Sequence, residues 1–417
     1  MSELDLGLKV GMRKLLWSMG MATRLDVELQ AVKGIGSRKG PETFTDLDVL
    51  GVSISPDARA STVIADCKTT RRESTSRMFW IAGVSGFVNA DHAYLVREHD
   101  VTEAARQLSS KLGIGILTSS ELGILQKIHE NEKFSSNPNL SFMFDRGEVE
   151  RHLRSYTQLA KKLDPLLKFR NFDYWINDDY RNISVLINRL KDSAATLDSS
   201  NSIHRSLFFD VCWLFLLTLI KACGYVRSGY LVDVPRAMQE YIFGGAAGFR
   251  EKETMAEYLN KARPAGVPEQ SALPTYFRPL VELVVRLLNR PGRMTESLRY
   301  LEIVSASSLK SELGSLPILA GEDLFDSIAA KLSADVCGFL VSACNLDPGF
   351  RSHARSEILG EVANGRGNRE NLFEWDNVGE IEVSFERAKT FGDDLDVGQE
   401  AIIQRSDLPP STGQAGS

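Results

Sequence analysis

The sequence predicts an α/β domain built on a mixed β-sheet, followed by a large, mainly α-helical region. Two observations support this fold class. Within about the first 125 residues, the predicted elements follow the order α-β-β-β-α-β-α-β. Three sequential strands followed by helix-linked strands are typical of a mixed sheet with helices on its faces. After Leu125, long stretches of helical periodicity dominate instead.

The N-terminal elements follow from apolar spacing and turn residues. Apolar residues recur at helical intervals over 6–19, and Gly20 is placed to end that helix. Residues 24–32 alternate polar and apolar as a strand does, and the runs 44–54 and 61–68 are separated by Ser55-Pro56-Asp57-Ala58, which favours a turn. The remaining predicted elements are a helix over 74–88, a strand over 92–97, a helix over 102–112 and a strand over 114–118.

The region after Leu125 is predicted to be mostly helical. Glycines at 244–248 break the series, and residues 262–268 have the composition of a loop. The expected helices are 148–167, 182–196, 206–222, 234–241, 279–288 and 316–345, the last with a break near Gly321. We therefore divide the chain into an α/β domain at 1–125, a mainly helical domain at 126–373, and an acidic segment with a disorder-prone tail at 374–417.

Bulk composition excludes several classes of protein. The chain has 417 residues, 43% of them hydrophobic, and a net charge of −6, so it is not a basic nucleic-acid coat. Its five cysteines form no CxxC pair, which argues against a disulfide framework or a zinc site and fits a reducing cytoplasm. The acidic N-terminus lacks the pattern of a signal peptide.

One segment is apolar enough to be tested as a membrane span. Residues 207–225 approach the length that crosses a bilayer. Asp210 and Lys221 interrupt the segment, and charges within a span are costly. We therefore expect a buried core helix and no membrane.

Two acids and a lysine form the candidate site. Asp48 lies in the strand predicted over 44–54, and Asp66 and Lys68 end the next strand. Because residues i and i+2 of a strand point to one face, Asp66 and Lys68 should project together. A hairpin between the two strands would bring Asp48 alongside them. Two carboxylates beside an ammonium suit Mg²⁺ with a water molecule at its side.

These residues resemble a known family. The element order, together with Asp48 and the Asp66-Cys67-Lys68 tripeptide on the middle strands, is similar to the PD-(D/E)XK nuclease superfamily, the fold of many restriction endonucleases. The resemblance covers about residues 1–125. It implies that Asp48, Asp66 and the backbone carbonyl of Cys67 bind Mg²⁺ or Mn²⁺, and that Lys68 orients or deprotonates the attacking water.

Two alternatives remain open at this site. Asp46 would face the same side as Asp48 and competes with it as a ligand, although Asp48 sits deeper in the apolar run. Many members of the family carry a glutamate on the first helix, and that helix has no acid here. Glu28 is the candidate substitute; without it there is no third acid. The number of bound metal ions is therefore open.

Basic residues flank the proposed site in the sequence. Arginine and lysine contacts to phosphate are the largest sequence-independent source of nucleic-acid affinity. We expect DNA contacts from Lys33, Arg38, Lys39, Arg71, Arg72 and Arg77.

The expected function is that of a metal-dependent DNA endonuclease, and the resemblance associates it with prokaryotic defence systems. A large helical region next to a nuclease is expected to serve regulation or assembly, through a protein partner or a second copy of the chain. The main alternative is a catalytically silent nuclease fold that acts as a binding or scaffold subunit. A third is an RNase, since nothing in the sequence separates DNA from RNA as substrate.

Overall fold

A computed structural model describes residues 3–30, 43–70, 74–130, 137–263, 271–310, 313–321 and 323–361. The predictions for Lys33, Arg38, Lys39, Arg71 and Arg72, and for the segment 374–417, lie outside the described residues. By its contacts the described chain belongs to one compact unit with no division near residue 125. The predicted boundary there marks a change from sheet to helices within that unit.

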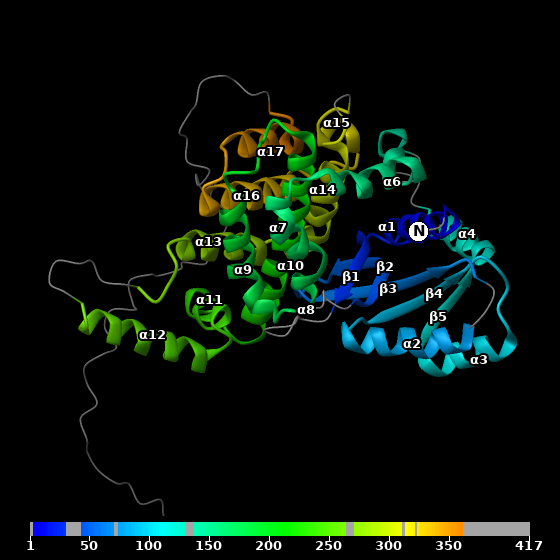
Figure 1. Ribbon diagram of the computed structural model, residues 1–417, viewed down its shortest axis with the longest axis horizontal. Coiled ribbons are helices and arrows are strands. Elements are labelled where there is room, and N and C mark those ends of the chain that lie inside the picture. The colour runs from blue at the N-terminus through cyan, green and yellow to red at the C-terminus, as the bar shows by residue number, and fades with distance from the viewer. Residues whose placement is uncertain are drawn as a thin grey trace, which may run out of the picture. The chain divides into compact units, whose positions relative to one another are not determined.

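The N-terminal part contains the predicted mixed sheet, with five strands in the order β1-β2-β3-β4-β5 (Figure 1). Strand β1 pairs with β2, and β2 with β3, in antiparallel fashion, whereas β3–β4 and β4–β5 are parallel. The elements are α1 (Glu3–Ser18), β1 (Ala22–Gln30), β2 (Thr43–Ile54), β3 (Ala60–Lys68), α2 (Ser74–Phe87), β4 (His92–Arg97), α3 (Glu103–Leu112), β5 (Ile114–Thr118) and α4 (Ser119–Ile128).

Helices cover both faces of this sheet. Helices α1 and α4 lie on one face, and α2 and α3 lie on the other (Figure 1). Leu8, Met12 and Leu15 of α1 belong to one core cluster with Val49 of β2 and Cys67 of β3. Alternate residues of β3 therefore point away from that core, and Asp66, which contacts Arg77 of α2 on the other face, is among them.

Two features end helices where the sequence indicated. Gly20, after α1, has a φ of 84°, a left-handed conformation that glycine adopts without a steric penalty. Thr102 caps the start of α3 with a side chain that accepts a hydrogen bond from the Ala105 amide, and Gly113, in the left-handed region, caps its end. These caps fix the lengths of the elements around the sheet.

The remainder of the described chain is mostly helical, as predicted. Helix α10, Ser202–Gly229, is its longest and forms the centre of this region. The other α-helices are α6 (Arg146–Ser155), α7 (Asp164–Lys168), α8 (Tyr174–Ile176), α9 (Asp179–Ser193), α11 (Val234–Ile242), α12 (Ala246–Lys261), α13 (Phe277–Leu288), α14 (Met294–Ser307), α15 (Leu316–Ala320), α16 (Ser327–Cys344) and α17 (Gly349–Leu359). Short 3₁₀ turns and a π-helical turn, η4 (Phe169–Asp173), connect several of them.

The predicted helices do not account for all of those observed. Helices α4, α8, α12, α14 and α17 were not predicted, and the predicted helix over 148–167 is broken into α6, two 3₁₀ turns and α7. Helices α10 and α16 are long and apolar enough to cross a membrane by length and composition, and most of each is buried inside the protein. Asp210, which interrupts the apolar run of α10, makes ion pairs with Arg24 and Arg170.

Glu302 of helix α14 joins the helical region to α1 and β1. Its carboxylate accepts hydrogen bonds from Arg13 (Nη2, 2.8 Å) and from the indole of Trp17 (3.2 Å). It also accepts from the backbone amide of Thr23 (2.8 Å) and from the Thr23 hydroxyl. Arg13 and Glu302 are both buried. A single carboxylate thus satisfies donors from two N-terminal elements.

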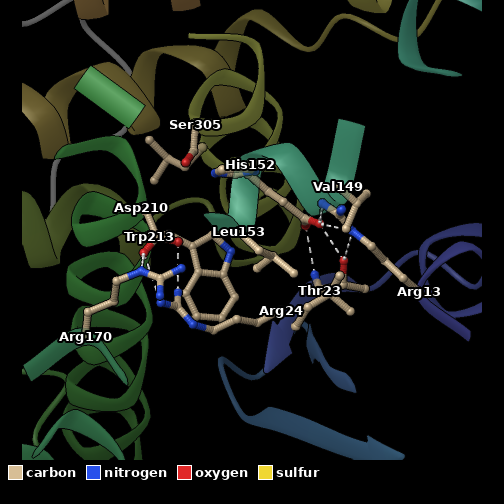
Figure 2. A pocket seen from close by; sticks show the side chains of 13 residues that line it. Arg13, Thr23, Arg24, Val149, His152, Leu153, Arg170, Asp210, Trp213 and Ser305 are labelled. Atoms are coloured by element: carbon tan, nitrogen blue, oxygen red, sulfur yellow. Dashed lines mark hydrogen bonds and ion pairs between the residues drawn. The ribbon is translucent and has the colours of Figure 1, made fainter. Parts of the chain in front are cut away.

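A second buried ion cluster lies beside the first, around a cavity of about 50 Å³ (Figure 2). Arg24 of β1 donates both terminal nitrogens to Asp210 of α10, at 3.1 and 2.9 Å, and Arg170 donates to the same carboxylate. His152 also lines the cavity. Burial, reinforced by nearby arginines and opposed by Asp210, lowers the pKa of His152 to about 3, so the imidazole is neutral at pH 7. These pairs fix β1 against the helical region.

Candidate active site

The candidate site lies where two neighbouring strands of the sheet separate. The β2–β3 ladder ends at the pair Val49–Ala65. Beyond it, β2 continues alongside β1 through Leu47, while β3 continues alongside β4 to the pair Lys68–Arg97. Asp48 and Asp66 lie next to this last β2–β3 pair, Asp48 adjoining Val49 and Asp66 adjoining Ala65. The separation leaves room for side chains between the two strands.

Asp48 is held at this separation by the backbone of the neighbouring strand. Its side chain is almost fully buried, and Oδ2 accepts a hydrogen bond of 2.7 Å from the Cys67 amide. The carboxylate therefore takes the place of a strand carbonyl in the ladder. Its other oxygen, Oδ1, lies 2.7 Å from the ammonium of Lys9 on α1. Asp46, the competing candidate, is exposed to solvent.

Asp66 is bound by an arginine from the helix that follows its strand. Arg77 of α2 donates two hydrogen bonds to the carboxylate, Nε at 2.7 Å and Nη2 at 2.6 Å. The same guanidinium stacks on Trp80, 3.4 Å from the ring centroid. Burial raises the pKa of Asp66 above its ordinary value, and the hydrogen bonds from Arg77 act in the opposite direction.

Lys68 stands between the two carboxylates. Its ammonium lies 3.5 Å from Asp48 Oδ2 and 3.8 Å from Asp66 Oδ1. The Lys68 side chain is 29% exposed, so it can reach solvent. The structure thus brings together the three residues that the sequence singled out, Asp48, Asp66 and Lys68.

Lys9 and Asp26 belong to the same site, and sequence reasoning did not find them. The Lys9 ammonium is 2.5 Å from Asp26 Oδ1 as well as 2.7 Å from Asp48. Burial disfavours the charged form of Lys9, but the two carboxylates outweigh burial and raise its pKa above the ordinary value. Lys9 and Arg13 lie four residues apart on one face of α1 and are both buried. That spacing of two cations on a largely apolar helix was the available signal.

Two carboxylates and one backbone carbonyl are the oxygen groups that a divalent cation would need to bind at this site. Asp48 Oδ2 and the Asp66 carboxylate lie on either side of Lys68, and the Cys67 carbonyl belongs to the residue between Asp66 and Lys68. Carboxylates and carbonyls are the donors that Mg²⁺ and Mn²⁺ prefer. Within the described ranges, no group of three or more His, Cys, Asp or Glu side chains is arranged around a common point. Glu28 lies opposite Asp46 in the β1–β2 ladder, further along the strand than Asp48.

Among the predicted DNA contacts, Arg77 is the one that the structure describes. Its guanidinium is engaged by Asp66 and Trp80, so a phosphate contact requires it to exchange Asp66 for the phosphate. Arg97 of β4, which was not predicted, is buried beside Lys68 in the β3–β4 ladder and donates a hydrogen bond to the Thr70 carbonyl. The positive charge near Asp66 thus comes from Arg77 of α2, Lys68 of β3 and Arg97 of β4.

Comparison with protein-family models, with curated proteins and with solved structures found no match to this chain. The interpretation of the site therefore depends on its own geometry and chemistry.

Proposed function

We propose that this chain is a metal-dependent endonuclease of the PD-(D/E)XK type that hydrolyses phosphodiester bonds of DNA. The observation that supports the proposal is the position of the Lys68 ammonium, 3.5 Å from Asp48 and 3.8 Å from Asp66, where β2 and β3 separate. Phosphodiester hydrolysis needs a positioned water and neutralisation of the charge that develops on phosphate oxygens. Two buried acids and a partly exposed lysine supply groups for both tasks.

In the proposed reaction, a water oxygen forms a bond to phosphorus while the bond to the leaving sugar oxygen breaks. The attacking water loses one proton, and the leaving oxygen takes up one proton from solvent water. Lys68 orients the attacking water or accepts its proton, and Asp48, Asp66 and the Cys67 carbonyl are the groups that would hold Mg²⁺ or Mn²⁺. A bound divalent ion would acidify the water and stabilise negative charge on the phosphate. Arg77 would move from Asp66 to a phosphate oxygen of the substrate.

The helical region is proposed to regulate or assemble the nuclease, as in multi-component prokaryotic defence systems. The support is the pair of buried ion clusters around Glu302 and Asp210, which tie α14 and α10 to the elements that carry Lys9 and Asp26. Movement of those helices would be transmitted to α1 and β1 by direct contact. This part of the proposal includes a protein partner or a second copy of the chain.

A second candidate is a catalytically silent nuclease fold that binds nucleic acid as a subunit of a complex. The observation that favours it is that both acids are already paired with cations, Asp48 with Lys9 and Asp66 with Arg77. Such a site would carry no free negative charge to attract a metal ion.

The two candidates differ in one experiment on the full-length protein. Supercoiled plasmid, single-stranded DNA and RNA are incubated with the protein in Mg²⁺, in Mn²⁺ and in EDTA. We expect cleavage of DNA in either metal and none in EDTA, because the proposed reaction needs a divalent cation to acidify the attacking water and to stabilise charge on the phosphate. Binding of DNA without cleavage in either metal would favour the silent subunit. Cleavage of RNA alone would mean that the substrate is RNA and not DNA.

A further inference from the structure

Lys9 occupies one side of the Asp48 carboxylate, and the catalytic groups occupy the other. Its ammonium contacts Oδ1, whereas the Cys67 amide and the Lys68 ammonium face Oδ2. Lys9 is only 4% exposed and lies on the helix that packs against the sheet core. A buried ammonium on a helix that packs against the sheet is not readily displaced from Oδ1 by ions from solvent.

Asp26 fixes Lys9 in this position through an unusual backbone conformation. Its φ is 51°, in the left-handed region that residues with a Cβ rarely adopt. The neighbouring pairs Leu25–Val49 and Val27–Leu47 are regular, so the distortion is confined to the residue that contacts Lys9. Local backbone strain of this kind persists where surrounding structure requires it, often at functional sites.

Each carboxylate of the site already has a cation as partner, without any bound ion. Asp26 and Asp48 contact Lys9, Asp66 contacts Arg77, and Lys68 lies 3.5 Å from Asp48 and 3.8 Å from Asp66. Arg97 adds a further positive charge near Asp66. Removal of Arg77 from Asp66 would free one carboxylate on the Oδ2 side. On the Oδ1 side, Lys9 remains between Asp26 and Asp48. Two-metal phosphodiesterases place their ions about 3.5–4 Å apart, so a second ion at this site would take Asp48 Oδ1, where the Lys9 ammonium lies.

We propose that Lys9 is a resident cation that closes the Oδ1 side of Asp48 and restricts the site to a single divalent ion. This inference rests on the proposed function and deepens it. It sets the expected number of divalent ions at one and assigns Lys9 the role of a positioning residue. Lys9 supplies by its fixed ammonium the positive charge that a second metal ion would otherwise bring to Asp48.

The test is the number of Mn²⁺ ions bound by the full-length protein, measured by electron paramagnetic resonance of the free ion during a titration. We expect one ion per chain for the wild type. Lys9→Met removes the ammonium and frees Asp26 and Asp48 together, so it should bind two. Its melting temperature should fall in EDTA and recover in Mn²⁺ by a larger step than in the wild type. Lys127→Met, at an exposed position on α4, is the matched control and should bind one.

A double variant keeps the test decisive if Lys9→Met folds poorly. Lys9→Met combined with Asp26→Asn removes the cation together with its additional carboxylate, so it should fold and bind one ion. Two ions on the wild type, or one ion on Lys9→Met, would overturn the role of Lys9 while leaving an endonuclease intact. No ion on the wild type would instead remove the metal site on which the proposed function depends.

Discussion

Replacing Glu302 with alanine is expected to destabilise the protein by about 3–5 kcal/mol, the usual cost of removing one partner of a buried ion pair. Arg13 would be left as a buried, unpaired cation, and the Trp17 indole and the Thr23 amide would lose their acceptor. Urea denaturation followed by far-UV circular dichroism measures the change. Glu253→Ala, at an exposed position of α12, is the matched control and should change stability little.

A charge-free replacement separates the ion pair from the packing. Arg13→Met combined with Glu302→Leu removes both charges and keeps apolar volume in the same space. Because paired hydrophobic replacements of buried ion pairs are often neutral, the double variant should recover the part of the loss that comes from the unpaired Arg13 charge. The part that comes from the Trp17 indole and the Thr23 amide should remain. If Glu302→Ala alone were as stable as the wild type, the junction between α14 and the N-terminal elements would not hold the fold together.

Asp66→Asn is expected to abolish cleavage without loss of stability. The asparagine keeps the size of the side chain but lacks the negative charge that a divalent cation needs. Loss of several kcal/mol of transition-state stabilisation would slow the reaction about 100-fold or more. Arg77, its main partner, retains 27% exposure and can turn to water. Plasmid cleavage and thermal melting on the same preparation measure the two effects.

The pH dependence of stability indicates in which direction Asp66→Asn should change the melting temperature. Burial raises the pKa of Asp66 in the folded state, so the folded protein holds the proton to a higher pH than the unfolded chain does. Stability therefore falls as pH rises from the ordinary Asp pKa through the raised one, and it stays lower above that window. Asp66→Asn lacks this loss and should melt at or above the wild-type temperature at pH 7. A lower melting temperature at pH 7 would mean that the Asp66 charge stabilises the fold.

The sheet and its acids were predictable because their signals are local. Alternation of polar and apolar residues with turn residues between the runs gave five strands, and those over 92–97 and 114–118 have the predicted bounds. Asp48, Asp66 and Lys68 meet because a tight hairpin joins β2 to β3. Strand order and the two-residue period of a strand were therefore sufficient to predict that these three side chains lie close together.

Other parts of the structure depend on contacts between distant segments. Helix α14 was missed because it is buried on nearly all sides, so its polar residues, such as Arg299 and Glu302, face partners inside the protein and no amphipathic pattern remains. Lys9 reaches Asp48 only once α1 has packed on the sheet and Asp26 has adopted its positive φ. Arg77 was expected to face phosphate because it is basic, and its packing on Trp80 places it beside Asp66.

The most direct test of the proposed active site is the rate at which the Lys68→Ala protein nicks supercoiled plasmid in Mg²⁺, compared with wild type and with Lys127→Ala. Lys68 is the residue that the proposal assigns to the attacking water, and a positioned acid–base group contributes about 10²–10⁴-fold. We predict that Lys127→Ala cuts at the wild-type rate and that Lys68→Ala, with an unchanged circular dichroism spectrum, is slower by at least about 100-fold. Cleavage by Lys68→Ala at the wild-type rate would contradict the assignment of this site.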